Sequence, residues 1–124
     1  MRLPEGIIEP PGTPAERDLL VRPGKDKPGL IKAIAETLAS GYVLRSRVIA
    51  GVLPRFGYSR RSADTTATNM MRNGYFIRGL KEHGVVPAVR KYRGKNLYYD
   101  ASLPVEDTDL EEVKAEIEAE LEDF

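Results

Sequence analysis

The chain has 124 residues, of which 41% are hydrophobic and 31% are charged, and this composition allows one small domain with a single core. It contains no cysteine, which excludes disulfides, thiolate metal sites and a cysteine nucleophile. No run of about 18 apolar residues is present, and the first residues, MRLPEGIIEPPG, lack the apolar stretch of a signal peptide, so we expect a cytoplasmic protein without a membrane partner.

The charges balance over the whole chain, with 19 basic and 19 acidic side chains, but they are unevenly distributed. Residues 1–29 carry five of each sign, residues 30–104 carry thirteen basic and four acidic side chains, and residues 105–124 carry one basic and ten acidic. A basic centre predicts a polyanionic partner, and the acidic end predicts a separate role. We therefore expect an arm and linker, a central domain and a C-terminal acidic helix over these three ranges.

The arm, residues 1–29, is rich in proline and glycine and offers one local signal. Thr13-Pro14-Ala15-Glu16 matches a capping box with proline at the first helical position, which predicts one short helix at 14–21. An extended arm that contains this pattern by chance is the alternative. The stretch RPGKDKPG, at 22–29, is typical of a linker.

Two amphipathic helices are predicted at the start of the central domain. Apolar residues at helical spacing predict the first from about Leu30 to Ala39, closed by Ser40-Gly41. Residues 42–44 form a short extended segment. Ser46 can cap the second helix, which the proline and glycine of PRFG, residues 54–57, bring to an end.

A third helix is predicted around GYSRRSADTTATNMMRNG, residues 57–74. Its many Thr, Ser, Asn and Asp residues have low helix propensity, but its apolar residues keep helical spacing across Gly74. We therefore favour one helix, kinked or straight, from Ser59 or Ser62 to His83-Gly84. A stop at Asn73-Gly74, a good C-cap pair, is the alternative.

The start of this third helix decides which residues it presents. A helix that begins near Asn69 would leave Arg60 and Arg61 in the preceding loop. Met70 and Met71 are expected in or near the core in either case.

Beyond Gly84 the pattern changes to short strands and then to an acidic helix. Ala88–Tyr92 and Asn96–Tyr99 predict a hairpin joined around Arg93-Gly94-Lys95. The last segment, VEDTDLEEVKAEIEAELEDF, predicts an amphipathic helix whose narrow apolar stripe comprises Leu110, Val113, Ile117, Leu121 and Phe124.

Three helices followed by a two-stranded hairpin is the element order of a winged helix-turn-helix. In LKEHGVVPAVRKYRGKNLYYDASL, residues 80–103, Leu80 and Gly84-Val85-Val86 precede a basic hairpin with aromatic residues on its return strand. This segment resembles the junction between recognition helix and wing in winged-helix regulators. The resemblance covers about residues 30–103 and implies a mainly α fold with a small β-hairpin. The length from Ser59 to Gly84 exceeds that of a typical recognition helix.

The resemblance implies double-stranded DNA as partner and assigns polar residues to two elements. The third helix would read the major groove, because hydroxyl, amide and guanidinium groups bond base edges and phosphates; its candidates are Arg60, Arg61, Ser62, Thr65, Thr66, Asn69 and Arg72. The hairpin would contact the backbone or a neighbouring groove; its candidates are Arg90, Lys91, Arg93, Lys95 and Asn96. The implied function is sequence-specific DNA binding by a transcriptional regulator or by an accessory factor of a phage or plasmid.

Two other binding functions stay open. One is a winged helix whose basic face contacts an acidic protein. The other is an RNA-binding module, for which Tyr92, Tyr98 and Tyr99 must be exposed so that bases can stack on them.

Enzyme chemistry has little support in this sequence. Asp64 and Glu82 are isolated acids in a basic region, and a lone carboxylate is not an acid–base pair. No glycine-rich phosphate loop and no nucleophile motif is present. His83, the single histidine, is expected to cap a helix end or to lie on the surface. We expect no catalytic residue, no cofactor and no metal site.

The acidic C-terminal helix has three interpretations. In the preferred one, its apolar stripe docks on the central domain or pairs with a second copy, which would give a homodimer through the terminal segments. It could instead cover the basic surface and weaken non-specific DNA binding. The third interpretation is a largely disordered segment that binds a partner.

Overall fold

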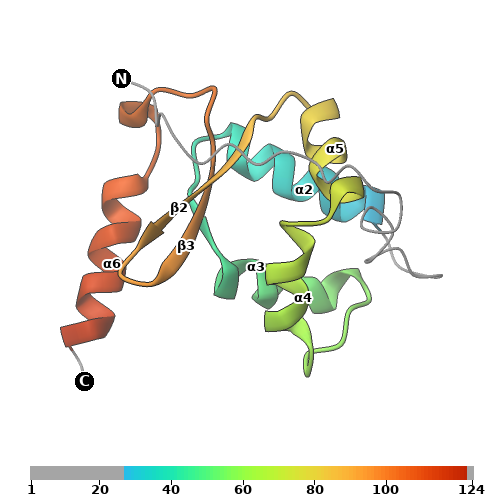
Figure 1. Cartoon of the computed structure of the whole chain (residues 1–124), viewed down its shortest axis with the longest axis horizontal. Coiled ribbons are helices and arrows are strands. Elements are labelled where there is room, and N and C mark those ends of the chain that lie inside the picture. Colours follow the sequence, from blue (N-terminus) through green and yellow to red (C-terminus); the bar gives the residue numbers. More distant parts are fainter. Residues whose placement is uncertain (1–26, 123–124) are drawn as a thin grey trace.

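Helices make up most of the part of the chain that the structure describes, which is residues 27–122 of a computed structural model. None of the helices in this range is long and apolar enough to cross a membrane. The short helix predicted at 14–21 lies outside the described residues. The elements, shown in Figure 1, are α2 (Lys27–Ala39), β1 (Leu44–Arg45), α3 (Ser46–Val52), the 3-10 helix η1 (Leu53–Phe56), α4 (Ala63–Met70), α5 (Gly74–Glu82), β2 (Pro87–Tyr92), β3 (Lys95–Asp100), the 3-10 helix η2 (Val105–Asp107) and α6 (Leu110–Glu122).

The three strands form one antiparallel sheet in the order β1-β3-β2. β2 and β3 are the predicted hairpin, and each boundary agrees with the prediction within one residue. β1 pairs Leu44 with Tyr98 and Arg45 with Leu97. The extended segment predicted at 42–44 therefore contributes a third strand, whose pairing the sequence did not indicate.

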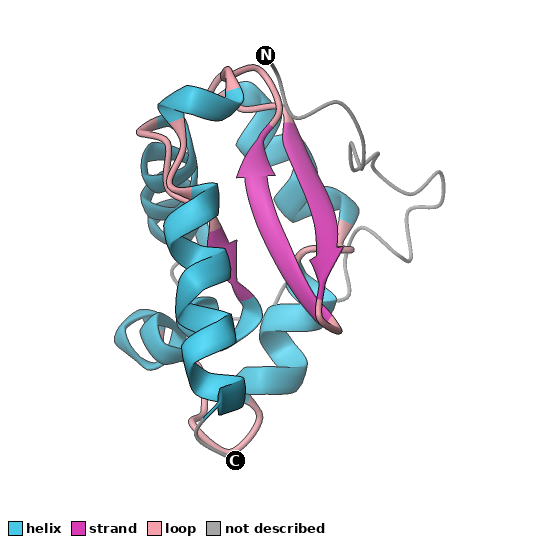
Figure 2. Ribbon diagram, turned by 90° about the vertical axis from the view of Figure 1, so that its left-hand side faces the viewer, coloured by secondary structure: helices cyan, strands magenta, loops and turns pink. Residues whose placement is uncertain are grey.

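The sheet separates two layers of helices, with α6 on one side and α2–α5 on the other (Figures 1 and 2). Successive strand residues point to opposite faces. Leu44 and Tyr98 accordingly belong to the core shared with α2–α5, whereas Leu97 and Tyr99 belong to the core under α6. The same alternation decides which hairpin side chains share a surface with α4.

The helical layer is built from two packed pairs, α3 with α4 and α2 with α5. The α2–α5 contact requires glycine at position 79, since a Cβ there would lie 2.8 Å from two carbons of the Ile31 side chain. Met70 and Met71 are fully buried in this core, as predicted.

The second predicted helix forms, but its start differs in detail. Ser46 is the first residue of α3, and Arg45 occupies the N-cap position without a side-chain hydrogen bond. The predicted Ser46 cap is therefore wrong. At the other end, the chain tightens into η1 and stops at Gly57, whose φ of 88° lies in the left-handed region that favours glycine.

The single long helix predicted across Gly74 is also wrong. The chain forms α4 and α5, separated at Met71–Asn73, where Asn73 has an extended ψ of 128°. The buried Asn73 side chain caps α5 by accepting a hydrogen bond from the Phe76 N–H at 3.1 Å. The apolar spacing continues across the break because both helices face one core, although they pack against different partners.

The acidic helix α6 docks on the outer face of the sheet with its apolar stripe. The stripe residues buried there are Leu110, Val113 and Ile117, and Leu121 is partly buried. The carboxylate of Asp109 fixes the start of α6 by accepting a hydrogen bond from the Val43 N–H at 2.6 Å. The Asp109 N–H donates to the Gly41 carbonyl at 3.0 Å. The stripe thus contacts its own chain, and Phe124 lies outside the described residues.

Candidate nucleic-acid interface

Three adjoining hollows run between α3, η1, α4 and the hairpin. The first lies where the start of α3, the middle of α4 and the hairpin tip meet. The second shares Arg47 and Asp64 with it and extends towards η1, and the third shares Thr68 and Asn96 with it and extends along β2. We call this surface the basic furrow; its charged and polar lining includes Arg47, Arg55, Arg60, Asp64, Thr68, Arg72, Lys91, Lys95 and Asn96.

The helix at the centre of the basic furrow begins at Ala63, which settles the uncertain start. Arg60, Arg61 and Ser62 precede α4, so their assignment to the helix is wrong. The turn is held locally, since the Arg61 N–H donates to the Ser59 hydroxyl at 3.2 Å. Arg60 still lines the furrow, beside Arg47 and Arg55.

The exposed face of α4 carries short polar side chains. Thr65 and Asn69 are exposed, as are Asp64 and the arginine that follows the helix, Arg72. Thr66 is half-buried, and none of Thr65, Thr66 and Asn69 lines the furrow hollows. The half-buried Thr68 lines two of the hollows, and its hydroxyl donates to the Asp64 carbonyl at 3.2 Å.

The hairpin divides its predicted cations between two faces. Lys91 pairs across the strands with Asn96, and both line the furrow. Arg90 pairs with Leu97, which faces α6, and paired residues share a face of the sheet. Arg90 therefore lies on the α6 face, away from α4.

The turn of the hairpin is divided in the same way. Arg93, whose φ is 52°, forms an ion pair with Glu118 of α6 at 3.5 Å. Lys95 pairs with Tyr92, which packs under α6, so Lys95 lies on the α6 face, but it also lines the hollow beside Arg45 and Arg47. Three of the five predicted hairpin residues, Arg90, Arg93 and Lys95, thus lie on the side of α6, and Lys95 also reaches the furrow.

Two carboxylates of α6 bond to side chains of the central domain, and one of them, Glu120, contacts residues that line the furrow. Glu120 accepts hydrogen bonds from the buried Arg45 at 2.7 and 3.1 Å and from the exposed Arg47 at 2.8 Å. The hydrogen bond from Arg45 is the main cause that lowers the pKa of Glu120. The Tyr92 hydroxyl donates to Glu118 at 2.8 Å, and this bond raises the pKa of Tyr92. Part of the positive charge of the central domain is therefore neutralised by carboxylates of α6.

The sequence-based list missed Arg47, Arg55 and Thr68. Arg47 and Arg55 are exposed residues eight positions apart, with Gly51 midway, so that they lie on one side of the α3–η1 segment. The sequence gives little sign of this, because Arg55 follows Pro54, beyond the predicted end of the helix that carries Arg47. Thr68 carries no signal either, since its place depends on the hairpin that lies opposite.

The aromatic residues offer no broad stacking surface. Tyr98 and Tyr99 are 4% and 1% exposed, and Tyr92 is half-buried with its hydroxyl bonded to Glu118. Base stacking needs an accessible ring face. The condition stated for an RNA-binding module is therefore not met by Tyr98 and Tyr99.

The described residues outside the furrow contain no group of side chains that could act as a metal site. His83 ends α5 as an exposed C-cap residue, as predicted. Between residues 27 and 122, no three His, Cys, Asp or Glu side chains lie close enough to hold a metal ion. Comparison of the chain with protein-family models, with curated proteins and with solved structures finds no match.

Proposed function

We propose that this protein binds double-stranded DNA through the basic furrow, with α4 in the major groove and the β2–β3 hairpin as a wing. Apart from the additional helix α5, the order α2-β1-α3-α4-β2-β3 supports a winged helix-turn-helix interpretation, because it places three helices before a hairpin that pairs with a short strand. Two features differ from the expected pattern. The α3–α4 connection, residues 53–62, is longer than a three- or four-residue turn, and α5 separates α4 from the wing.

The size and polarity of α4 suit a groove. Eight helical residues span about 12 Å, similar to the width of the major groove. Thr65, Thr68 and Asn69 offer hydroxyl and amide groups that can bond base edges, and Asp64 can accept from a cytosine amine. These small side chains weaken the helix but allow its backbone to approach the duplex closely.

The cations around α4 suit the phosphates on either side. Arg47, Arg55 and Arg60 lie at one end of the furrow, and Lys91 and Lys95 come from the hairpin. Phosphate contacts fix orientation and register, whereas base contacts select the sequence. The convergence of cations from α3, η1, the turn before α4 and the hairpin beside α4 is the observation that carries the proposal.

The experiment is duplex binding measured between about 50 and 200 mM salt by fluorescence anisotropy. Use of the six exposed furrow cations would give a log–log slope of about −5.4, since each neutralised phosphate contributes about −0.9. Removal of Arg60 and Arg72 together should reduce the slope by about 1.8. Removal of Lys32 and Arg78, exposed cations on α2 and α5, is the matched control and should leave it unchanged. No binding at 50 mM salt, or a flat slope, would refute the proposal.

The biological role that we propose for such a DNA-binding protein is transcriptional regulation, or an accessory function in a phage or plasmid. Both roles require a preference for one DNA sequence over others. The polar side chains of α4 are the groups through which that preference would arise.

A further inference from the structure

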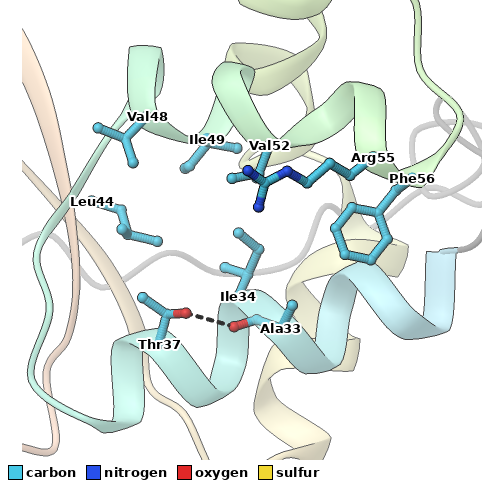
Figure 3. Close-up of a pocket in the computed structure, with 9 residues that line it drawn as sticks. All are labelled: Ala33, Ile34, Thr37, Leu44, Val48, Ile49, Val52, Arg55 and Phe56. Carbon is cyan, nitrogen blue, oxygen red and sulfur yellow. Dashed lines mark hydrogen bonds between the residues drawn. The ribbon is translucent and has the colours of Figure 1, made fainter.

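A separate cavity of about 300 Å³ lies on the other side of α3, between α2, β1 and η1 (Figure 3). Its volume is at the lower end of the range of roughly 300–1,000 Å³ that is typical of small-molecule sites. Seven of its nine lining residues are apolar, namely Ala33, Ile34, Leu44, Val48, Ile49, Val52 and Phe56. Val48 is 47% exposed, so this apolar lining reaches the surface.

Only two polar side chains line the cavity. The hydroxyl of Thr37 donates to the Ala33 carbonyl of its own helix at 2.8 Å, so its proton is already used. Arg55 extends over the apolar walls, and Figure 3 shows its guanidinium near Val52 and Ile34. Within residues 27–122 no carboxylate pairs with Arg55, although Glu118 and Glu120 pair with other arginines.

We propose that this cavity binds a small amphiphilic carboxylate, with its hydrocarbon part among the apolar side chains and its carboxylate on Arg55. A guanidinium at the edge of an apolar cavity offers two parallel N–H donors that match the two carboxylate oxygens. The seven apolar residues remove the hydrocarbon part from water. A cavity with apolar walls and one positive charge at its edge therefore favours a ligand that has a hydrocarbon part and one negatively charged end.

The shape of the surface favours a small ligand over a partner helix. An amphipathic helix needs apolar contacts spaced over two turns or more. The other large exposed apolar residues, Tyr42 and Tyr75, do not line this cavity. The apolar surface that is accessible around Val48 is therefore confined to the cavity itself.

Arg55 also connects the cavity with the basic furrow, where it lies in the same hollow as Arg47 and Arg60. A carboxylate that neutralises Arg55 would remove one cation from the furrow. The ligand would therefore weaken DNA binding and make the salt slope shallower by about 0.9. This consequence rests on the proposed function, whereas binding of the carboxylate does not.

The test uses octanoate as the probe and the full chain without DNA. Methyl NMR signals of Ile34, Val48 and Ile49 are followed during titration with octanoate and, in parallel, with 1-octanol. We expect saturable shifts of these methyls, and octanoate should bind more tightly than 1-octanol by about tenfold or more because its hydrogen bonds are charge-assisted. Arg55→Gln, a change at an exposed side chain, should remove that preference while the fold is retained.

Several results would overturn the inference. If 1-octanol binds as tightly as octanoate to the unchanged protein, the cavity takes a purely apolar occupant, such as a side chain of a partner protein. If octanoate shifts methyls throughout the molecule without saturation, the binding is not at this cavity. Equal octanoate affinity in Arg55→Gln would show that the guanidinium does not hold the carboxylate.

A DNA titration in the presence of octanoate separates the two proposals. Octanoate binding without any duplex binding would support the cavity site and refute the proposed function. Duplex binding without methyl shifts from octanoate would support the proposed function and refute the cavity site. Binding of both ligands with unchanged DNA affinity would overturn the coupling through Arg55.

Discussion

Neighbouring cations of β2 should differ in their effect on DNA binding because they lie on opposite faces of the sheet. Lys91 pairs with Asn96 and lines the basic furrow, whereas Arg90 pairs with Leu97 on the face covered by α6. Replacement of each by Gln removes one positive charge and keeps much of the side-chain stem. The two variants therefore form a matched pair in charge, in strand and in distance from the hairpin turn.

The expected difference follows from counterion release. Loss of one phosphate contact in Lys91→Gln should make the log–log salt slope shallower by about 0.9, and Arg90→Gln should leave the slope unchanged. When the salt concentration rises fourfold, from 50 to 200 mM, each phosphate contact lowers the affinity by a further factor of about 3.5. The affinity of Lys91→Gln should therefore fall about 3.5-fold less over this range than that of the unchanged protein. Fluorescence anisotropy with one duplex over this range measures both slopes, and thermal unfolding checks that both variants fold.

The outcome for Arg90→Gln is the more demanding part of the comparison. If both variants change the slope alike, the face of the sheet does not decide which cations contact DNA. If Arg90→Gln alone changes it, the interface lies on the side of α6, and the assignment of the basic furrow would be refuted.

Three further results are expected. Asn69→Ala should lower the preference for a duplex selected from a random pool over an unselected one by about 1–3 kcal/mol, without a change in salt slope; equal weakening for both duplexes would exclude a base contact. Ile117→Ala should cost about 2–5 kcal/mol in urea denaturation, because Ile117 of α6 is fully buried against the sheet. Ala115→Ser on the exposed face of α6 should stay within about 0.5 kcal/mol. A cost below about 1 kcal/mol for Ile117→Ala would contradict the docking of α6. Because Arg45 lowers the pKa of Glu120 below its ordinary value of 4.5 in the folded state, the stability from this carboxylate is present above that value and lost as the pH falls through the folded pKa. Glu120→Gln should therefore lose less stability than the unchanged protein on acidification below about pH 5, whereas Glu116→Gln should not show this difference; identical profiles for the unchanged protein and Glu120→Gln would show that the pair does not act.

The sequence predicted the elements that have strong local signals. The hairpin was placed within one residue because strand alternation and the Arg93-Gly94 turn are both local features. The stripe of α6 was found because its spacing is regular and its other faces are acidic. The short strand β1 has only two residues, which is too few for any periodic pattern, so its pairing depends on the position of β3.

The break between α4 and α5 could not be derived from periodicity. The apolar spacing across Gly74 indicates that both segments face the core, but it does not indicate the directions of the two helix axes. The structure sets that direction through two different packing partners, α3 and α2, and through the Asn73 cap. The sequence marks Asn73-Gly74 as a possible helix boundary of the C-cap type, whereas in the structure Asn73 is the N-cap of the next helix.

Of the twelve candidate residues, five line the furrow, namely Arg60, Arg72, Lys91, Lys95 and Asn96. The other seven do not line it, namely Arg61, Ser62, Thr65, Thr66, Asn69, Arg90 and Arg93. Charge alone could not separate the lining residues from Arg90 and Arg93, because that distinction depends on the face of the sheet and on the carboxylates of α6. The ion pairs of Glu120 join residues 73 and 75 positions apart, a distance in sequence over which local patterns carry no information.

Amide NMR mapping during titration with a short duplex at low salt tests the central claim most directly. We predict that the largest shifts lie in the basic furrow, at Thr68 and Lys91, and on the exposed face of α4 beside it, at Thr65 and Asn69. Exposed amides of α2 and α5 such as Lys32 and Arg78 should remain unchanged. Shifts concentrated on α2 and α5, or no shift at low salt, would contradict the proposal that α4 and the hairpin bind DNA.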